Sequence, residues 1–395
     1  MRVLMVTTSF PRHEGDHAGH FIATLAERIV SLGNEVTVLA PHEGATAERE
    51  TVRGVRVERF RYLPVWAEQV AYGSGIVINL RRRPLAAAGL LPFTMALRRS
   101  VRRLAPTSDI VHVHWGPTAA LAAPWRSGQP YVLTLHGSDV TLARRGGLWL
   151  GMLRRALRDA AGVDVVAEEQ RRFLAEQGLW DAARPIEVIP AGVPEDLIAR
   201  PRDVRAEGAF RFLYAGRLVE SKGVTDLLGA FAEVRKAGID AELELIGAGP
   251  LEDSLRERAG TGPLAGRVRF RGAIPHDKAL DAIARADALV LPSHGEGSPL
   301  VVAEALALGT PVIGSRVGAI PELLGSYGLV SGPGDVRALA ADMEQLARDP
   351  DLWQRLSAKG RASAAEHLGW DTIARETVEF YHAALARERG ESTAP

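Results

Sequence analysis

The feature that most constrains the fold is a strand–loop–helix–strand pattern that occurs once in each half of the chain. Near the N-terminus, an apolar run over 2–8 is followed by a loop, an amphipathic helix that ends at Gly33, and a second apolar run over 35–40. In the second half the apolar runs are 210–215 and 241–246, and the helix between them also ends at a glycine. Such a unit with short loops is a right-handed parallel crossover. The pattern therefore predicts two α/β domains with parallel sheets.

Seven further apolar runs extend both halves into doubly wound sheets. Most of them end at glycine, proline, serine or histidine, and segments of helical periodicity alternate with them. They cover 110–114, 131–135, 162–166, 186–189, 268–271, 288–291 and 311–313. We expect two Rossmann-like domains facing across a cleft, over 1–195 and 196–369, because ligands bind beyond the carboxyl ends of parallel strands. Residues 370–395 are expected to form a final helix, up to residue 389, and a disordered tail.

Length and composition are those of a folded protein with more than one core. The 395 residues exceed the usual size of one domain, and 46% of them are hydrophobic against 24% charged. The absence of cysteine excludes disulfides, thiol catalysis and cysteine-ligated metals. The N-terminal apolar run is too short for a signal peptide, and the uncharged run over 84–97 is too short to span a bilayer. We therefore expect a soluble, cytoplasmic protein.

The two halves differ in charge, although basic and acidic residues both total 48. Residues 1–194 hold 24 basic and 18 acidic side chains, whereas residues 195–395 hold 24 and 30. Between Glu68 and Asp109 there is no acidic residue, and this stretch contains seven arginines. These are Arg81, Arg82, Arg83, Arg98, Arg99, Arg102 and Arg103. Two interpretations stay open, an ordinary solvated face or a docking patch for an anionic surface, while the zero net charge indicates no nucleic-acid partner.

Part of this arginine-rich stretch has helical spacing. Apolar residues recur three or four positions apart, and four of the arginines fall largely between them. The apolar residues are Leu90, Phe93, Leu97, Val101 and Leu104, and the arginines are Arg98, Arg99, Arg102 and Arg103. The pattern predicts an amphipathic helix over 93–104 with a basic flank. Either this helix docks on an anionic membrane surface, or its apolar face packs in the core and the arginines only solvate the protein surface.

In the second half, a loop with two cations joins a strand to a helix. Arg217 ends the strand and Lys222 precedes the helix, with Gly216 and Gly223 on either side. Helix N-termini carry free N–H groups and a positive dipole, and glycine lets a ligand approach the backbone closely. These features favour a diphosphate ligand, which arginine binds with a bidentate fork and lysine with a point charge. A solvated surface loop is the alternative.

A pair of carboxylates lies in the next strand-to-helix connection. Ser298 is a suitable N-cap with Pro299 at the first helical position, which leaves Glu296 in the preceding loop. Glu304 is the only charge in the apolar run that follows. A carboxylate in such surroundings needs donors, and its two oxygens suit two neighbouring hydroxyls such as a ribose diol. The alternative is an exposed turn of an amphipathic helix.

The first half of the chain contains several histidines that are candidates for a functional role. His136 follows the strand over 131–135 and so lies at a strand's carboxyl end, where working side chains are common, although a structural histidine is the alternative. His112 and His114 alternate on one strand face, which ordinary sheet packing explains. The loop over 10–20 matches no strong metal-ligand spacing, so we expect it to bind a polar ligand rather than a metal. It contains His13, Glu14, Asp16, His17 and His20.

Several reaction classes lack their sequence motifs. The chain has no nucleophile elbow of the hydrolases, no phosphate loop of the ATPases and no kinase signature. Gly249 marks a second tight turn between strand and helix, but Glu252 stands where a dinucleotide fingerprint has its third glycine. This departure argues against a dinucleotide-dependent oxidoreductase.

Taken together, these segments resemble the retaining glycosyltransferases of family 4, which have the two-domain GT-B fold. The resemblance spans most of the chain and rests on the first loop with Gly15 and Gly19, the run 134–139, the loop 216–223, and two glutamates separated by seven residues. The glutamate pair is the most specific signal, because the acid spacing, the Gly-Ser-Pro turn and the small-residue helix agree. Many relatives have paired glycines in the first loop, whereas here they are spread apart.

The resemblance implies a role for each candidate. Arg217 and Lys222 would bind the diphosphate of a sugar nucleotide, Glu304 would bind the ribose, and Glu296 would contact the sugar hydroxyls. His136 would lie near the reacting face of the sugar, so the candidates for catalysis are His136, Arg217, Lys222 and Glu296. The implied donor-binding set, with Ile274 near the base, is Gly15, Gly19, Gly216, Arg217, Lys222, Gly249, Ile274, Ser298, Pro299, Leu300, Val301 and Glu304.

The resemblance also implies a reaction and its partners. The acceptor would attack from the face that the nucleotide leaves, and the donor phosphate would take the proton, so no protein base, metal or cofactor is required. The final helix would cross back onto the first domain, which would bind a saccharide or lipid-linked acceptor in polysaccharide or glycolipid assembly. A sugar-nucleotide epimerase of the same fold and a non-catalytic sugar-nucleotide-binding subunit are the alternatives.

Overall fold

The computed structural model describes residues 1–13, 15–16, 18–73, 75–122, 127–181, 184–202 and 208–390, so Glu14 and His17 of the first loop and the tail over 391–395 lie outside the described residues. Contacts divide the chain into unit 1, Met1–Pro190 with Trp370–Pro395, and unit 2, Ala191–Gly369. The division predicted from the sequence lies between 195 and 196. Helix α8 (Glu195–Ala199) packs against helices of unit 2, which is why the observed division comes earlier in the chain.

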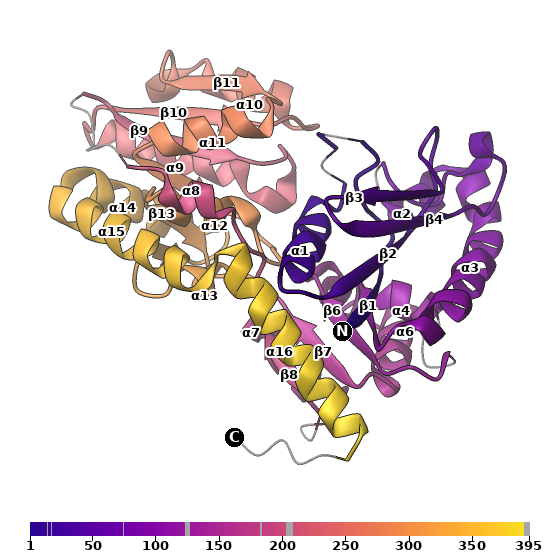
Figure 1. Ribbon diagram of the computed structural model, residues 1–395. Helices are drawn as coiled ribbons and strands as arrows, with labels where there is room; N and C mark the ends of the chain where they lie inside the picture. The colour runs from indigo at the N-terminus through magenta and orange to yellow at the C-terminus, as the bar shows by residue number, and fades with distance from the viewer. Residues whose placement is uncertain are drawn as a thin grey trace. The chain divides into compact units, whose positions relative to one another are not determined.

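Unit 1 is built on an eight-stranded sheet in the order β3-β4-β2-β1-β5-β6-β7-β8, parallel except for the β3–β4 hairpin (Figure 1). Its strands are β1 (Arg2–Val6), β2 (Glu35–Pro41), β3 (Arg49–Val52), β4 (Val55–Phe60), β5 (Ile110–His114), β6 (Tyr131–Leu135), β7 (Gly162–Val165) and β8 (Ile186–Val188). Its helices are α1 (His20–Ser31), α2 (Ile76–Arg82), α3 (Pro84–Leu104), α4 (Gly116–Ala122), α5 (Ser138–Ala143), α6 (Gly147–Arg158), α7 (Glu168–Glu176) and α16 (Trp370–Glu388), with the 3-10 turns η1 (Val65–Ala67) and η2 (Ala105–Thr107).

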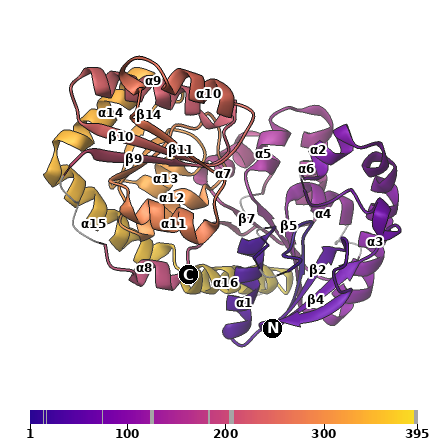
Figure 2. The ribbon, with the colours of Figure 1, turned by 90° about the horizontal axis from the view of Figure 1, so that it is seen from above.

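Unit 2 is built on a six-stranded parallel sheet in the order β11-β10-β9-β12-β13-β14. Its strands are β9 (Phe210–Ala215), β10 (Ala241–Ile246), β11 (Val268–Gly272), β12 (Ala288–Leu291), β13 (Val312–Ser315) and β14 (Leu329–Ser331). Its helices, besides α8, are α9 (Val224–Lys236), α10 (Glu252–Ala259), α11 (His276–Arg285), α12 (Leu300–Ala307), α13 (Ile320–Leu324), α14 (Val336–Arg348) and α15 (Pro350–His367), with η4 (Glu220–Lys222) and η5 (Gly262–Leu264). Figure 2 shows α9, α10 and α14 on one side of this sheet and α11, α12 and α13 on the other.

The predicted fold class is confirmed. Counted along the chain, the unit 2 strands lie in the order 3-2-1-4-5-6 of dinucleotide-binding sheets, and unit 1 contains the same order with additional edge strands. Three strands were not predicted: β3, β4 and β14. β3 is mostly polar and exposed, β4 has charged residues between apolar ones, and the two pair as a hairpin at the sheet edge. β14 is only three residues long.

Both faces of the unit 1 sheet are covered, and alternate residues of each strand supply the two cores. Leu4 and Val6 of β1 belong to a cluster with residues of α3, α4 and α6. Val3 and Met5 point the other way, into a cluster with residues of α1 and α16. This alternation is expected for a strand whose side chains point successively to opposite faces.

Helix α3 decides whether the predicted apolar face of the arginine-rich stretch docks on a membrane or packs in the core. Phe93, Leu97 and Val101 are fully buried in the core, so the apolar face predicted from helical spacing packs inside the protein. The helix is longer than the predicted 93–104 because Pro84 occupies its first turn, where proline needs no N–H partner. Pro92 lies inside the helix. The predicted apolar face therefore does not serve as a docking face.

The four arginines of α3 also differ from one another. Arg98 donates from Nε to the backbone oxygen of Leu121 at 2.7 Å, and Arg103 pairs with Glu58 of β4. Arg99 and Arg102 are exposed. Arg103 is exposed as well, so only Arg99 and Arg102 are both exposed and without an acidic partner among the described residues. The four therefore do not form one uniform basic patch. Over the described ranges, none of the helices combines enough length and apolar character to span a membrane.

The C-terminal helix α16 is part of the unit 1 core. It packs against α1 and β7 (Figure 1). Trp370, Phe380 and Tyr381 are buried in the cluster with α1. The contact with β7 is close, because a Cβ at Gly162 would lie 2.8 Å from the Phe380 ring. The absence of a side chain at Gly162 therefore allows the aromatic ring to approach the sheet.

This packing predicts a large loss of stability when the ring is removed. Phe380→Ala is expected to destabilise unit 1 by about 3–5 kcal/mol, because a buried aromatic ring is replaced by a cavity. Thermal unfolding followed by circular dichroism would measure the effect. Glu379→Ala, at the exposed neighbouring position, is the matched control and should change the melting temperature little. Equal melting temperatures for Phe380→Ala and the wild type would contradict the assignment of α16 to the unit 1 core.

Candidate functional site

The strand order of unit 2 indicates its binding edge. β9 and β12 are neighbours, although two strands lie between them in the sequence, so the sheet order reverses at this point. Ligands of doubly wound sheets bind outside the carboxyl ends of strands at such a reversal. The loops over 216–223 and 292–299 follow these two strands, and the N–H of His294 donates to the Ser221 oxygen at 2.9 Å. The two loops that carry the predicted candidates are therefore in contact.

Lys222 and Glu296 meet where these loops touch. Lys222 Nζ donates to Glu296 Oε1 at 2.5 Å, and Ser293 Oγ donates to the same oxygen at 2.6 Å. The Glu296 side chain is only 8% exposed. Two donors on one oxygen leave Glu296 Oε2 without a partner among the described residues. The structure thus holds a carboxylate in a fixed orientation with one oxygen available.

Arg217 lies at the end of β9 and is exposed. Its backbone oxygen accepts a hydrogen bond from the Tyr214 hydroxyl at 2.7 Å, whereas its guanidinium has no partner among the described residues. The backbone is thus fixed while the cation stays available to a ligand. An available guanidinium close to a helix start suits an anion with several oxygens.

Glycine is required in these loops by packing. A Cβ at Gly223, which has φ +64°, would lie 2.0 Å from the Pro292 oxygen, and a Cβ at Gly249 would lie 2.2 Å from the Leu218 oxygen. Gly216 is also tight, since its Cβ would lie 2.9 Å from the Tyr214 hydroxyl. The loops therefore need glycine to pack on one another, in addition to any approach of a ligand.

The start of α12 differs from the prediction. The helix begins at Leu300, its N-cap is Pro299, and no side chain caps it, so the predicted Ser298 cap is wrong. Pro299 has extended dihedrals, and its oxygen accepts the first bond of the helix from Val302 at 3.0 Å. The N–H groups of Leu300 and Val301 precede any intrahelical acceptor and can serve a ligand.

Glu304 lies on α12 and contacts the start of α11. His276 Nε2 and Glu304 Oε1 are 2.7 Å apart, and this hydrogen bond raises the pKa of His276 above its ordinary value. The Glu304 side chain is 12% exposed. Ile274, two residues before His276, is half-buried in the β11–α11 turn. His276 is not among the residues predicted from the sequence; its position at the head of a helix after a strand was the available signal.

In unit 1, His136 lies just beyond β6, and a buried carboxylate fixes its backbone. Asp139 Oδ2 accepts from the His136 N–H at 2.7 Å, and Oδ1 accepts from the Gly116 N–H at 2.5 Å. Burial raises the pKa of Asp139 to about 6. The carboxylate thereby joins the turn after β6 to the turn after β5.

The His136 ring contacts His114, which the sequence analysis had assigned to ordinary sheet packing. His114 Nδ1 and His136 Nε2 are 3.2 Å apart, and Phe21 of α1 packs edge-on at 5.1 Å from the His136 ring. Burial lowers the pKa of His136 to about 4. Two alternating histidines on the predicted strand that precedes the 131–135 strand in the sequence were the signal that could have indicated this contact.

The first loop is held by its own ion pair. Arg12 Nε donates to Asp16 Oδ2 at 2.6 Å and keeps the pKa of Asp16 well below its usual range. Gly19, the N-cap of α1, has φ +66°, and a Cβ there would lie 2.1 Å from the Ser9 oxygen. Gly15 also has positive φ, without a close neighbour. Within the part of the chain that the structure describes, no three histidine, aspartate or glutamate side chains could together hold a metal ion.

The structure brings together only some of the predicted candidates. Within unit 2, Lys222 contacts Glu296, and Glu304 contacts His276. His276 is the first residue of α11 and follows Ile274 by two positions. Gly15, Gly19 and His136 belong to unit 1. The glycines position loops and carry no side-chain chemistry.

Comparison with known proteins gives consistent matches along the chain. The family model "Glycosyltransferase Family 4" matches residues 18–197, and "Glycosyl transferases group 1" matches residues 209–349. The chain is 30% identical to a glycogen synthase of Mycobacterium tuberculosis, over 99% of this chain and 96% of that protein. It is 29% identical to a GDP-mannose-dependent alpha-(1-6)-phosphatidylinositol monomannoside mannosyltransferase of the same organism, over 96% and 97%. The structure is similar to sucrose-phosphate synthase from Thermosynechococcus elongatus, with a TM-score of 0.75, 21% identity, and coverage of 98% and 99%.

The His276–Glu304 pair predicts a titration that can be measured without any ligand. The pKa of His276 should lie above about 6.5, its ordinary value, and Glu304→Gln should bring it down because the carboxylate is lost. A raised histidine pKa stabilises unit 2 fully below the unfolded pKa, and the contribution is lost as pH rises through the folded pKa. Histidine ring chemical shifts followed against pH would measure this. Glu257→Gln, on the exposed surface of α10, is the control, and the same His276 pKa in both variants would contradict the pair.

Proposed function

Because this chain belongs to the family 4 glycosyltransferases, we propose that it transfers a sugar from a nucleoside diphosphate sugar to an acceptor hydroxyl with retention of anomeric configuration. The observation that carries the proposal is the contact between Lys222 and Glu296, which joins the two loops at the reversal point of the unit 2 sheet. Both matching family models and the relatives above are glycosyltransferases, and none of these findings supports the epimerase alternative.

In this proposal the diphosphate lies at the β9–α9 loop. Arg217 has a free guanidinium and Lys222 is held next to the start of α9, where helix N–H groups and the dipole favour an anion. Negative charge builds on the leaving phosphate as the bond to the sugar breaks. Cations already fixed in place stabilise that charge without reorganisation.

The two glutamates bind hydroxyls in different parts of the donor. Glu304 accepts from the ribose diol, with Ile274 beside the base, and the N–H groups at the start of α12 complete the site. Glu296 accepts from a sugar hydroxyl through Oε2, the oxygen that Lys222 and Ser293 leave available. Carboxylates that are already anchored through one oxygen need little reordering to bind a ligand.

Unit 1 supplies the acceptor side and a contact to the sugar. His136 contacts the sugar near its reacting face, and the loop with Gly15 and Gly19 completes this side. The acceptor hydroxyl attacks from the face that the nucleotide leaves, and the donor phosphate takes its proton. The reaction needs no protein base, no metal and no cofactor.

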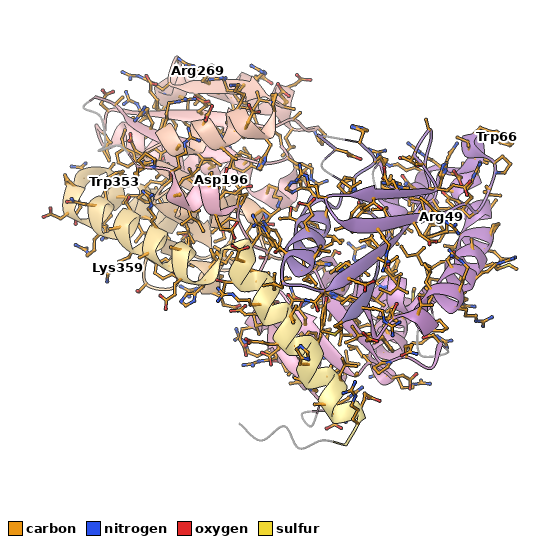
Figure 3. All side chains as sticks on the ribbon, viewed as in Figure 1. Arg49, Trp66, Asp196, Arg269, Trp353 and Lys359 are labelled. Carbon is orange, nitrogen blue, oxygen red and sulfur yellow. The ribbon has the colours of Figure 1, made fainter. Side chains whose placement is uncertain are left out.

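The acceptor is a saccharide or a lipid-linked saccharide, so the enzyme acts in polysaccharide or glycolipid assembly. A lipid-linked acceptor requires approach to a membrane, and the outer side of α3 supports such an approach. Leu91 and Met95, one turn apart on α3, are 68% and 62% exposed. Trp66 of η1, which contacts α3, is 72% exposed and labelled in Figure 3. Tryptophan and aliphatic side chains suit the interface of a bilayer.

Basic residues flank this exposed apolar surface. Among the described residues, none of Arg81, Arg82, Arg83, Arg99 and Arg102 pairs with an acidic side chain. Each arginine near an anionic leaflet contributes about 1 kcal/mol of attraction. Exposed apolar residues with a basic border therefore favour an anionic lipid surface as the partner of α3 and η1.

The diphosphate assignment predicts the effect of removing either cation. Arg217→Ala and Lys222→Ala should each lower kcat/KM by about 100-fold to 1,000-fold, because one preorganised donor to developing charge is lost. Glu304→Gln should instead weaken nucleoside diphosphate binding. Calorimetry with UDP and GDP, and transfer from UDP-glucose and GDP-mannose with and without EDTA, would measure both. Arg355→Ala, at an exposed position of α15, is the control.

Three results would contradict the proposed function. They are near-wild-type transfer by both cation variants, turnover of the donor sugar without any acceptor, and activity that EDTA abolishes and a divalent ion restores.

The membrane assignment predicts salt-sensitive binding to anionic vesicles. The chain should sediment with vesicles of phosphatidylglycerol and phosphatidylcholine, and not with phosphatidylcholine alone, because attraction between exposed charges falls off within about 8 Å at physiological salt. Replacing the five arginines by glutamine, or Leu91 and Met95 by glutamine, should abolish sedimentation. Leu32→Gln, an exposed apolar position after α1, is the control. Equal binding to both vesicle types would leave a soluble acceptor as the better assignment.

A further inference from the structure

Three histidine rings lie together at the carboxyl ends of β5 and β6. The His112 and His114 ring centroids are 4.1 Å apart, and the His114 and His136 rings are stacked at 5.3 Å with an interplanar angle of 16°. His114 Nδ1 lies 3.2 Å from His136 Nε2, a hydrogen-bond distance. A hydrogen bond between two imidazole nitrogens needs one proton between them, so one ring donates and the other accepts.

The hydrogen bonds of His112 are complete without His114. Thr134 Oγ1 donates its one proton to Asp164 Oδ2 at 2.8 Å. The same hydroxyl lies 2.6 Å from His112 Nε2, and in this second hydrogen bond it must accept. His112 therefore carries its proton on Nε2 and accepts at Nδ1 from the Tyr381 hydroxyl at 2.6 Å. The ring contacts that of His114 at a tilt of 38° and makes no hydrogen bond to it. Among the described residues, His136 is the one hydrogen-bond partner of the His114 side chain.

The second nitrogen of His114 decides which ring donates. His114 Nε2 is buried and has no hydrogen-bond partner among the described residues. If the His114 proton were on Nε2, a buried N–H would be left unpaired, and such orphaned donors are rarer than unpaired acceptors. Burial also lowers the pKa of His114 and of His136, so both rings are neutral near pH 7. His114 therefore carries its proton on Nδ1 and donates to His136 Nε2.

We propose that His114 is a positioning residue that holds His136 in the Nδ1–H tautomer, so that His136 presents a hydrogen-bond donor to an oxygen of the donor sugar. His136 Nδ1 has no partner among the described residues, and the side chain is only partly buried. Asp139 fixes the backbone of His136 while His114 fixes its ring. The sugar contact itself rests on the proposed function, whereas the tautomer rests on the hydrogen bonds alone.

The tautomer determines what His136 can do. Its Nε2 lone pair accepts from His114 and its Nδ1 is protonated, so neither nitrogen can take a proton from an acceptor hydroxyl. His136 therefore acts by donating a hydrogen bond, which agrees with a reaction in which the donor phosphate takes the proton. Without the His114 donor, His136 can carry its proton on Nε2 and turn a lone pair toward the sugar oxygen.

Three variants separate this role from a structural one. His114→Asn keeps a donor, because the Asn amide nitrogen takes the place of the imidazole Nδ1. His114→Leu removes the donor and keeps an apolar side chain in the buried position. Tyr381→Phe is the matched control, because it removes a buried hydrogen bond from the neighbouring His112 and leaves the His114–His136 bond intact.

The measurement is the histidine tautomer in the full chain, read from long-range proton–nitrogen NMR correlations after labelling with nitrogen-15 histidine. We expect His136 protonated on Nδ1 in the wild type, in His114→Asn and in Tyr381→Phe. In His114→Leu a measurable share of His136 should be protonated on Nε2, because the donor that excludes this form is gone. With UDP-glucose and GDP-mannose as donors, kcat of His114→Leu should fall by about 10-fold to 100-fold, the range for losing a group that orients another. Its donor KM and its affinity for UDP and GDP should stay close to wild type, and kcat of His114→Asn should be restored.

The proposal is overturned if wild-type His136 is protonated on Nε2, or if His114→Leu keeps both the tautomer and kcat. It is also overturned if His114→Asn loses as much activity as His114→Leu. Should His114→Leu fail to fold, the wild-type spectrum and the Asn variant still decide the assignment. A wild-type chain that transfers from neither donor sugar would count against the proposed function, while its His136 tautomer would still decide the role of His114.

Discussion

Parallel strands joined by right-handed crossovers are the constraint on which the rest of the structure depends. Such connections bring the carboxyl end of every strand in a sheet to the same edge. In unit 2 this places the loop after β9 against the loop after β12, and Lys222 meets Glu296 across 74 positions of sequence. In unit 1 the same rule places β5 beside β6, so that His114 reaches His136. Each contact is a consequence of strand order.

Burial of the unit 1 sheet on both faces explains its polar interior. A strand covered on two sides has no solvent to satisfy a polar side chain, so such residues must pair with one another. His112, Thr134, Asp164 and Tyr381 form a continuous series of hydrogen bonds from three neighbouring strands and α16. Burial raises the pKa of Asp164 and lowers that of His112 to about 3, which is the electrostatic effect of removing water from these groups.

Much of this fold could be predicted because its central strands are continuous apolar runs. The bounds of β5, β6, β9, β10 and β12 agree with the sequence analysis. The β3–β4 hairpin was not predicted because its exposed face is charged. The predicted Ser298 cap was wrong because the proline after it stays outside the helix. For side-chain partners such as His114 and His276 the sequence offers only a position at a strand end or helix start, because the contacts themselves depend on the register of strands and the position of helices distant in the sequence. A motif indicates that a residue is near a ligand, while only the fold indicates what holds that residue in place.

The two candidate carboxylates of unit 2 are held in the same way. Glu296 receives two donors on Oε1, and Glu304 receives His276 on Oε1, so each has its second oxygen free of partners among the described residues. An unpaired carboxylate in a largely buried position would be costly, and one anchored through both oxygens would have to break a bond before it could accept from a ligand. Anchoring through one oxygen avoids both costs. It fixes the direction of the free lone pairs, which is the property that recognition of a polyhydroxylated ligand requires.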